Sequence, residues 1–264
     1  MIYRISGRDN KTIKMVKSLK RKNGRQAVGR FVAEGRRIAE DAFQYAAERI
    51  YCTVVSDEFS TSEAEMVEKA DLICGHVYIV PNSIFADISD TDTPQGILVV
   101  MSMAERCLFE LSDEMKTVVV LDGVAEPGNM GTIIRTAEAL GFDGMYLMKG
   151  CTDIYSPKSV RSTMGSIFRM NFKTDCTKED VLELKNRGFS IISTEPCGET
   201  ALEEFKTGGK QAVIIGNEAH GVSKAMHDLA DVRLKISMDG NAESLNAAVA
   251  AGIVMHWLKS FGKK

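Results

Sequence analysis

Aliphatic and polar residues alternate in blocks along the second half of the chain. Val118–Leu121 is a short aliphatic run, as expected of a strand that is buried on both faces. Similar runs predict further strands, and amphipathic stretches between them predict helices. The expected strands are 118–121, 144–148, 190–193, 212–215 and 232–236, and the expected helices are 131–140, 156–165, 178–187, 222–229 and 243–259. Because strands and helices alternate, we expect an α/β domain with a parallel sheet that helices cover on both faces.

The first hundred residues have the pattern of a separate, smaller α/β domain. Asn10 is suited to cap a helix that runs from Lys11 to about Lys22 and ends at Asn23-Gly24. Further strands are expected at 31–35, 50–55, 77–80 and 97–101, and further helices at 36–49, 62–70 and 83–88. We therefore predict two domains, residues 1–105 and 116–264, joined by a linker at 106–115.

The composition is typical of a soluble globular protein, with 44% hydrophobic and 26% charged residues in 264. No apolar run approaches membrane-spanning length, and the first residues do not form a signal peptide, so we expect a cytoplasmic protein without a membrane partner. The six cysteines are dispersed and include no C-x-x-C pair, which indicates reduced thiols. His220 and His227 lack a third ligand nearby, so no metal is expected.

Positive charge is concentrated at the start of the chain. Residues 1–37 hold twelve Lys and Arg against Asp9 and Glu34, a net charge of 12 − 2 = +10, whereas the whole chain carries −3. Such a segment is typical of polyanion binding, and the alternative is a lysine-rich helix that is merely solvated. We favour the polyanion, because ten net charges in one segment repel each other without a partner.

Three loops that follow predicted strands combine glycine with carboxamide or carboxylate side chains. They span 122–131, 216–221 and 237–242, and the last leads into a helix expected to hold Ser244 and Asn246 in its first turns. Ligands of open α/β sheets bind at the carboxyl ends of strands, although ordinary strand-to-helix turns also look like this. The glycines at 128 and 131 do not have the spacing of a dinucleotide fingerprint, and no Gly-Lys-Ser/Thr follows them, which excludes a P-loop.

The motifs in these loops resemble those of the SpoU-type (TrmH-like) RNA 2′-O-ribose methyltransferases of the SPOUT superfamily. In order, they are Asn129-x-Gly131-x-x-x-Arg135-Thr-Ala137, Ile215-Gly-Asn-Glu218-Ala-His-Gly221 and Ser244-Leu-Asn246-Ala-Ala-Val-Ala. Phe31-Val-Ala-Glu-Gly35 and Thr93-Pro-Gln-Gly-Ile97 similarly resemble the substrate-binding domain of that family, which has an L30e-like fold. One departure is Ser237, which stands where the family usually has proline.

The resemblance implies a fold, a reaction and an assembly. The C-terminal domain would carry a deep trefoil knot, which general topology rules would not suggest. The enzyme would use S-adenosylmethionine to methylate a ribose 2′-hydroxyl, as a homodimer whose active site takes residues from both subunits. The full N-terminal domain favours ribosomal RNA as substrate. One alternative is an enzyme that acts on transfer RNA. The other is a non-catalytic RNA-binding protein that functions in ribosome assembly.

The resemblance also implies roles for single residues. Arg135 would stand at the 2′-hydroxyl; because arginine is a poor base, we expect it to stabilise developing alkoxide charge and to hold the adjacent phosphate. The other expected catalytic residues are Asn129, Glu218, Ser244 and Asn246. The expected cofactor contacts are Thr194, Gly216, Asn217, Ile236 and Leu245. The residues expected to bind RNA are Lys11, Lys14, Lys17, Arg21 and Arg25. A sulfonium methyl group is already an activated electrophile, so this chemistry needs no metal.

Overall fold

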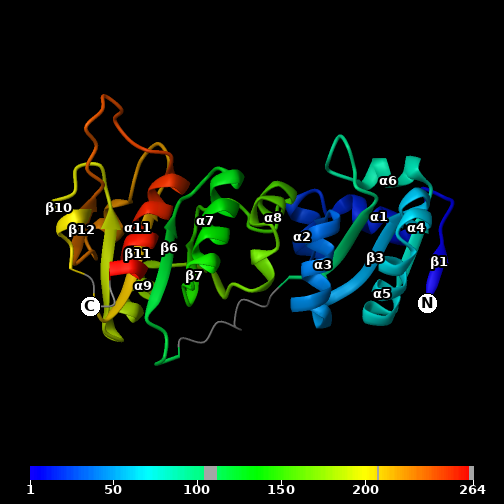
Figure 1. The fold of residues 1–264 in the computed structure, drawn as a ribbon, viewed down its shortest axis with the longest axis horizontal. Coiled ribbons are helices and arrows are strands. Elements are labelled where there is room, and N and C mark those ends of the chain that lie inside the picture. The colour runs from blue at the N-terminus through cyan, green and yellow to red at the C-terminus, as the bar shows by residue number, and fades with distance from the viewer. Residues whose placement is uncertain (104–111, 207, 262–264) are drawn as a thin grey trace. The chain divides into compact units, whose positions relative to one another are not determined.

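The computed structural model of the chain describes residues 1–103, 112–206 and 208–261, which fall into two compact units (Figure 1). Residues 1–104 and 153–169 form the first unit, and residues 105–152 and 170–264 form the second. Segment 153–169 thus groups with the N-terminal unit, although it lies inside the stretch that the sequence assigned to the second domain. Most of the predicted linker, 106–115, lies outside the described residues, so the domain boundaries stay a prediction.

The first unit is built on a five-stranded mixed sheet in the order β1-β4-β3-β5-β2. β1 and β3 run parallel to β4, whereas β5 runs antiparallel to both β2 and β3. The strands are β1 (Ile2–Arg4), β2 (Arg30–Glu34), β3 (Ile50–Ser56), β4 (Val77–Val80) and β5 (Ile97–Ser102). The helices are α1 (Lys11–Ser18), α2 (Lys22–Val28), α3 (Arg36–Tyr45), α4 (Asp57–Ser62), α5 (Ala64–Cys74), α6 (Asn82–Ile88) and α8 (Pro157–Thr163). An α/β unit was predicted here, but not strand β1.

The helix predicted from residue 11 to about residue 22 is in fact two helices. Asn10 caps α1 as predicted, with its side chain accepting a hydrogen bond from the backbone of Thr12 at 2.8 Å. However, α1 ends at Ser18, and Gly24 lies inside α2 instead of ending a helix. A Cβ at position 24 would lie 2.1 Å from the Ser18 carbonyl oxygen, so only glycine lets α2 pack this closely. Gly29, with φ of +64°, ends α2.

The second unit is built on a seven-stranded sheet in the order β10-β12-β9-β11-β6-β7-β8, in which every neighbouring pair is parallel. Its strands are β6 (Thr117–Asp122), β7 (Gly144–Met148), β8 (Phe172–Cys176), β9 (Phe189–Thr194), β10 (Thr200–Ala201), β11 (Lys210–Gly216) and β12 (Val232–Lys235). Its helices are α7 (Pro127–Ala139), α9 (Lys178–Asn186), α10 (Lys224–His227) and α11 (Ala247–Phe261). All five predicted strands are present. β8 was missed because it is partly exposed and rich in polar residues, and β10 because it has two residues.

Helices cover both faces of this sheet, as the alternation of elements predicted. On one face, Val118, Val120 and Ile214 pack in a cluster with Val181 and Leu184 of α9. Successive strand residues point to opposite faces, so their equally buried neighbours face the other side, where α11 contacts both α7 and β11. The trefoil knot stays a prediction. None of the described helices has the length and apolar character needed to cross a membrane.

The starts of α7 and α11, which carry the sequence motifs, differ from the predicted ones. α7 begins at Pro127, so residues 128–131 form its first turn and are not part of the preceding loop. Glu126 caps this helix and proline suits its first position, where no backbone N–H is needed. α11 begins at Ala247, so Ser244 and Asn246 precede it. The carboxamide oxygen of Asn246 accepts the backbone N–H of Ala248 at 2.9 Å, which caps the helix from outside.

Candidate active site

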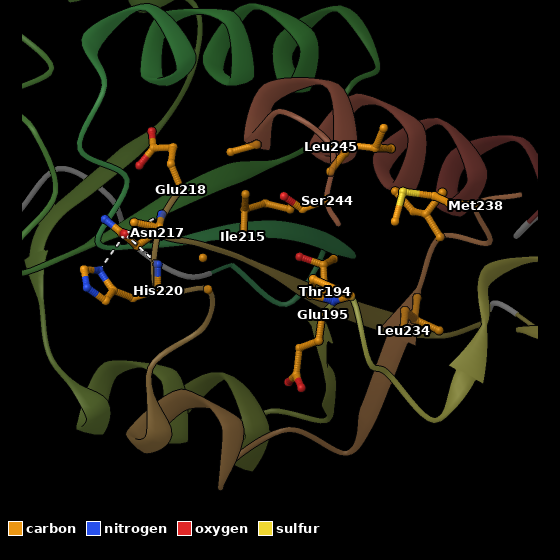
Figure 2. A pocket seen from close by; sticks show the side chains of 17 residues that line it. Thr194, Glu195, Ile215, Asn217, Glu218, His220, Leu234, Met238, Ser244 and Leu245 are labelled. Carbon is orange, nitrogen blue, oxygen red and sulfur yellow. Dashed lines mark hydrogen bonds between the residues drawn. The ribbon is translucent and has the colours of Figure 1, made fainter. Parts of the chain in front are cut away.

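A cavity of about 330 Å³ lies at the carboxyl ends of β9, β11 and β12, beside the start of α11 (Figure 2). This volume falls within the range of small-molecule sites, roughly 300–1,000 Å³. The five residues predicted to contact the cofactor all line it, together with two of the predicted catalytic residues. These seven are Thr194, Gly216, Asn217, Ile236, Leu245, Glu218 and Ser244.

The cavity is also lined by residues that the sequence did not single out. Glu195 directly follows β9, and its carboxylate accepts a hydrogen bond from the Ser193 hydroxyl at 2.6 Å and lies 3.6 Å from the His227 ring. The sequence could have indicated Glu195 as a site residue, because it lies just after a predicted strand. Ala247 and Ala250 line the cavity from α11, where their small side chains leave room for a ligand.

A chain of hydrogen bonds joins the three sequence motifs at the rim of this cavity. The Asn129 Nδ2 donates to Glu218 Oε1 at 2.9 Å, and the Asn246 Nδ2 donates to Asn129 Oδ1 at 3.0 Å. The Glu218 carboxylate also accepts the backbone N–H groups of Ala125 at 3.0 Å and Glu126 at 3.1 Å. Residues from α7, from the loop after β11 and from the segment before α11 are thereby held in fixed relative positions.

These contacts determine the charge of Glu218. Partial burial by itself would raise the pKa of this carboxyl group, but the hydrogen bonds from Asn129 and from the backbone of Ala125 and Glu126 outweigh it and lower the pKa. Glu218 is therefore ionised at neutral pH, and its oxygens are already engaged as acceptors. One of these oxygens accepts a hydrogen bond from the Asn129 carboxamide and so fixes the orientation of that side chain.

Asn217 and Gly216 shape the loop after β11. The Asn217 Nδ2 donates to the Gly123 carbonyl at 2.7 Å, and its Oδ1 accepts the backbone N–H groups of Ala219 and His220. A Cβ at Gly216 would lie 2.3 Å from backbone atoms of Gly221 and Val222. Gly216 thus lines the cavity, and its missing side chain also leaves space for the backbone of its own loop.

Arg135 lies apart from the cavity within its own chain. It follows Asn129 by six residues along α7, a rise of about 9 Å, and its side chain is exposed. In the part of the chain that the structure describes, Arg135 has neither an ion pair nor a side-chain hydrogen bond. The structure thus brings Asn129, Glu218 and Asn246 together and leaves this guanidinium available to another molecule.

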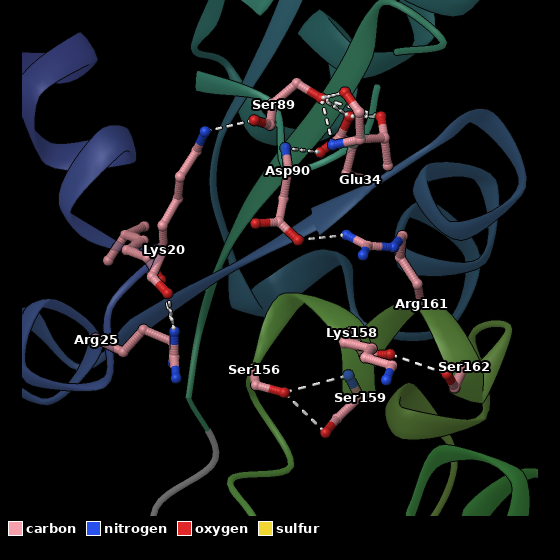
Figure 3. A network of polar contacts seen from close by, with 12 residues as sticks. Lys20, Arg25, Glu34, Ser89, Asp90, Ser156, Lys158, Ser159, Arg161 and Ser162 are labelled. Atoms are coloured by element: carbon pink, nitrogen blue, oxygen red, sulfur yellow. Dashed lines mark hydrogen bonds and ion pairs between the residues drawn. The ribbon is translucent and has the colours of Figure 1, made fainter. Parts of the chain in front are cut away.

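Some basic side chains of the N-terminal segment are already paired with groups of the protein. Arg25 is buried: its guanidinium donates to Asp153 at 2.6 Å and to the carbonyls of Leu19 and Lys20, and Figure 3 shows the contact with Lys20. Arg25 is therefore not available to an RNA phosphate, and its prediction as an RNA contact is wrong. Lys14 pairs with Asp9 at 2.8 Å. The exposed side chains of Lys11, Lys17 and Arg21 have no ion pair with any described residue.

Comparison with known proteins agrees with this geometry. Residues 116–256 match the model of the SpoU rRNA Methylase family. The chain belongs to the SpoU rRNA methylase family. Residues 10–99 match the MRM3-like substrate binding domain, so both parts of this SpoU protein have counterparts among known methyltransferases. The chain is also 32% identical over 256 residues to the 23S rRNA (guanosine(2553)-2′-O)-methyltransferase RlmP of Bacillus subtilis, covering 97% of this chain and 98% of that protein.

Solved structures extend the likeness to the whole SpoU fold. The AdoMet-bound rRNA methyltransferase from Sinorhizobium meliloti is 27% identical with a TM-score of 0.85, covering 98% of this chain and 97% of that one. The SpoU methyltransferase AviRb from Streptomyces viridochromogenes, in complex with AdoMet, is 25% identical with a TM-score of 0.82, covering 95% and 97%. The present chain is accordingly an RNA methyltransferase that uses S-adenosylmethionine.

The lining of the cavity fits that cofactor. Leu234, Ile236, Met238 and Leu245 offer apolar surface for a nucleoside base, whereas Thr194, Glu195 and Ser244 offer polar groups for a ribose and an amino-acid end. Among the described residues, no three His, Cys, Asp or Glu side chains gather in a way that could hold a metal ion.

Proposed function

We propose that this protein transfers a methyl group from S-adenosylmethionine to a ribose 2′-hydroxyl of ribosomal RNA in the cytoplasm. The observation that carries the proposal is the full-length match to a relative named as a 23S rRNA 2′-O-methyltransferase, which includes the N-terminal domain. The rim network supports it, because the residues that it holds come from the three motifs on which the family resemblance rests.

We assign the binding of the cofactor to the cavity walls at the ends of β9, β11 and β12. S-adenosylmethionine, when bound, supplies an electrophilic methyl group. The apolar side chains of Ile236 and Leu245 would hold its base, and Glu195 and Thr194 would bind polar groups. The small side chains of Ala247 and Ala250 keep this space open, so the start of α11 sets the depth of the site.

In this assignment the nucleophile is the ribose oxygen and Arg135 is the group that acts on it. When the ribose oxygen accepts a methyl group, its hydroxyl proton must leave, and negative charge would grow on the oxygen. The Arg135 guanidinium would stabilise that charge and bind the neighbouring phosphate, while the proton passes to water. Glu218, Asn129 and Asn246 position the loops around the reacting atoms. Ser244, exposed at the cavity, would hydrogen-bond the substrate or cofactor.

The position of Arg135 favours a homodimer. Because the Arg135 side chain lies apart from the cavity of its own chain, a second copy is needed to bring it to a reaction centre. α11 carries an exposed apolar stripe suited to such contact: Val249 is 52% exposed and Ile253 is 39% exposed, one turn apart. We therefore propose an isologous dimer that includes this stripe.

The first unit would bind the RNA. Lys11, Lys17 and Arg21 present exposed cations there, whereas Lys14 is already paired with Asp9. Mapping ribose 2′-O-methyl marks in RNA from cells with and without the protein tests the whole proposal. One or more marks in ribosomal RNA that disappear with the protein are expected. A missing mark in transfer RNA would instead correct the substrate, and unchanged marks in both would contradict the activity.

A further inference from the structure

Three aromatic rings form a continuous stack at the outer edge of the first unit's sheet. The Tyr3 ring lies 5.5 Å from the Tyr78 ring at an interplanar angle of 25°, and 6.3 Å from the His76 ring at 26°. Tyr3 and Tyr78 are direct partners in the pairing of β1, the edge strand, with β4. Tyr3 is 37% exposed and His76 is also exposed, so the stack is open to solvent at this edge.

A second flat surface lies near the stack, beside helix α1. The Arg30 guanidinium lies 3.3 Å from the centre of the Tyr51 ring, which is 40% exposed, and it also contacts the Met15 sulfur on α1 at 3.3 Å. Met15 and Tyr78 border the same hydrophobic cluster. The ring stack and the Arg30–Tyr51 pair therefore lie on the face of the sheet that α1 covers. We call Tyr3, Tyr51, His76 and Tyr78, with Arg30, the aromatic strip.

The basic residues of β1, of the segment after it and of the start of α1 differ in whether an acidic side chain pairs with them. Arg4 pairs with Asp57 and Arg8 with Asp87, so these cations are matched locally. Lys11, which precedes the α1 residues that border the strip, is exposed and has no ion pair among the described residues. Flat rings beside an unmatched cation suit a ligand with flat faces and negative charges.

We propose that the aromatic strip binds unpaired nucleotides of the RNA substrate, with bases stacking on its rings and Lys11 contacting the backbone. This inference rests on the proposed function, because it takes RNA as the substrate. Unpaired RNA presents its base faces, whereas bases in a duplex are stacked on each other and hidden. Aromatic side chains next to cations are the usual means of binding single strands, and every base can stack on them. The site therefore selects unpaired over paired RNA more than it selects sequence.

The test compares RNA affinity in full-length variants by fluorescence anisotropy, with an unpaired oligoribonucleotide of about 12 nucleotides and a duplex of the same length. Tyr3→Leu combined with Tyr51→Leu removes two rings but keeps apolar bulk. We expect affinity for the unpaired RNA to fall at least about fivefold for each ring, and affinity for the duplex to change little. Tyr3→Phe combined with Tyr51→Phe keeps the rings and should bind normally. Tyr45→Leu, at another exposed tyrosine of this unit, is a matched control.

Three results would overturn the inference. The first is unchanged affinity of the leucine pair for unpaired RNA. The second is an equal loss for unpaired and duplex RNA, which would indicate general damage that thermal unfolding can detect. The third is normal RNA affinity together with a changed oligomer mass of the leucine pair, because the aromatic strip would then contact another copy of the protein. Methyl transfer by the wild-type protein separates this inference from the proposed function: an active wild type with unaffected variants refutes the strip alone, and an inactive wild type refutes the function.

Discussion

Asn129 donates a hydrogen bond to Glu218 across 89 residues of sequence, at 2.9 Å. The bond connects the first turn of α7 to the loop after β11, and Asn246 extends it to the segment before α11 at 3.0 Å. Each of these residues belongs to a different sequence motif. We therefore regard the Asn129–Glu218 pair as the centre of the rim of the active site, on which the position of the catalytic loops depends.

Exchanging the partners of this pair tests its role. Asn129→Asp places a carboxylate against the ionised Glu218, so we expect repulsion, a lower melting temperature and at least a tenfold loss of methyl transfer. Adding Glu218→Gln places a carboxamide donor against the carboxylate introduced at position 129. The double variant should therefore recover part of the melting temperature and part of the methyl-transfer rate. Thermal unfolding and methyl-transfer rates measure the effect. A double variant whose loss relative to the wild type equals the sum of the two single losses would show that the two residues act independently.

The pH dependence of stability provides a second test of the pair. Hydrogen bonds lower the pKa of Glu218 in the folded protein, whereas the unfolded carboxyl group titrates at about pH 4.3. The carboxylate thus contributes stability that is fully present above the unfolded pKa and is lost as pH falls through the lower folded pKa. We expect the wild type to be more stable than Glu218→Gln at neutral pH, with the difference shrinking in acid. Urea unfolding at several pH values measures it, and a difference that grows in acid would contradict the assignment.

Most strands of the second unit could be predicted from the sequence, but not all of them. Aliphatic runs identified the buried strands of the second unit, because a strand covered on both faces leaves a plain signal. Exposed β8 and two-residue β10 leave no such signal. The family motifs predicted residues that line the cavity. The start of α7 was predicted too late, because Gly128 and Gly131 are residue types typical of loops.

Side-chain partners were the part that could not be predicted. Arg25 looked like its basic neighbours, yet Asp153, 128 residues away, holds it in a buried ion pair. Gly216 was expected to contact the cofactor; it lines the cavity, but its lack of a side chain also makes room for the backbone at Gly221, a contact that the sequence did not predict. The contact of Arg25 joins segments that are far apart in the sequence, and the contact of Gly216 crosses a loop. The periodic pattern of hydrophobic residues predicts neither kind of contact.

Filling the cavity from α11 should remove cofactor binding without unfolding the protein. Ala250 lines the cavity and is only partly buried, so Ala250→Leu adds bulk toward the site without replacing a core residue. We expect affinity for S-adenosylmethionine to fall at least tenfold by calorimetry, with little change in melting temperature. Ser260→Leu adds a leucine at an exposed position of the same helix and should bind normally. Normal affinity in Ala250→Leu would mean that the cofactor binds elsewhere.

Light scattering tests the proposed dimer. The wild type should have a mass of about 58 kDa, which is twice the 29.0 kDa of the chain. Val249→Asp combined with Ile253→Asp places charge on the exposed stripe of α11 and should give monomers that have lost methyl transfer. Leu72→Asp, at a leucine that is 88% exposed on α5, is the control and should remain dimeric. A monomeric wild type at micromolar concentration would refute the dimer, and with it the delivery of Arg135 by a partner.

The most direct measurement is tritiated methyl transfer to ribosomal RNA from cells that lack the protein, comparing the wild type with Arg135→Ala. Because Arg135 is exposed and makes no ion pair with a described residue, its removal should leave folding and S-adenosylmethionine affinity unchanged. We expect methyl incorporation by the wild type and a loss of about 100-fold or more in Arg135→Ala. Arg135→Lys should recover little, because a single ammonium cannot reproduce the planar fork of donors. Near-normal transfer by Arg135→Ala would show that Arg135 does not act on the ribose 2′-hydroxyl.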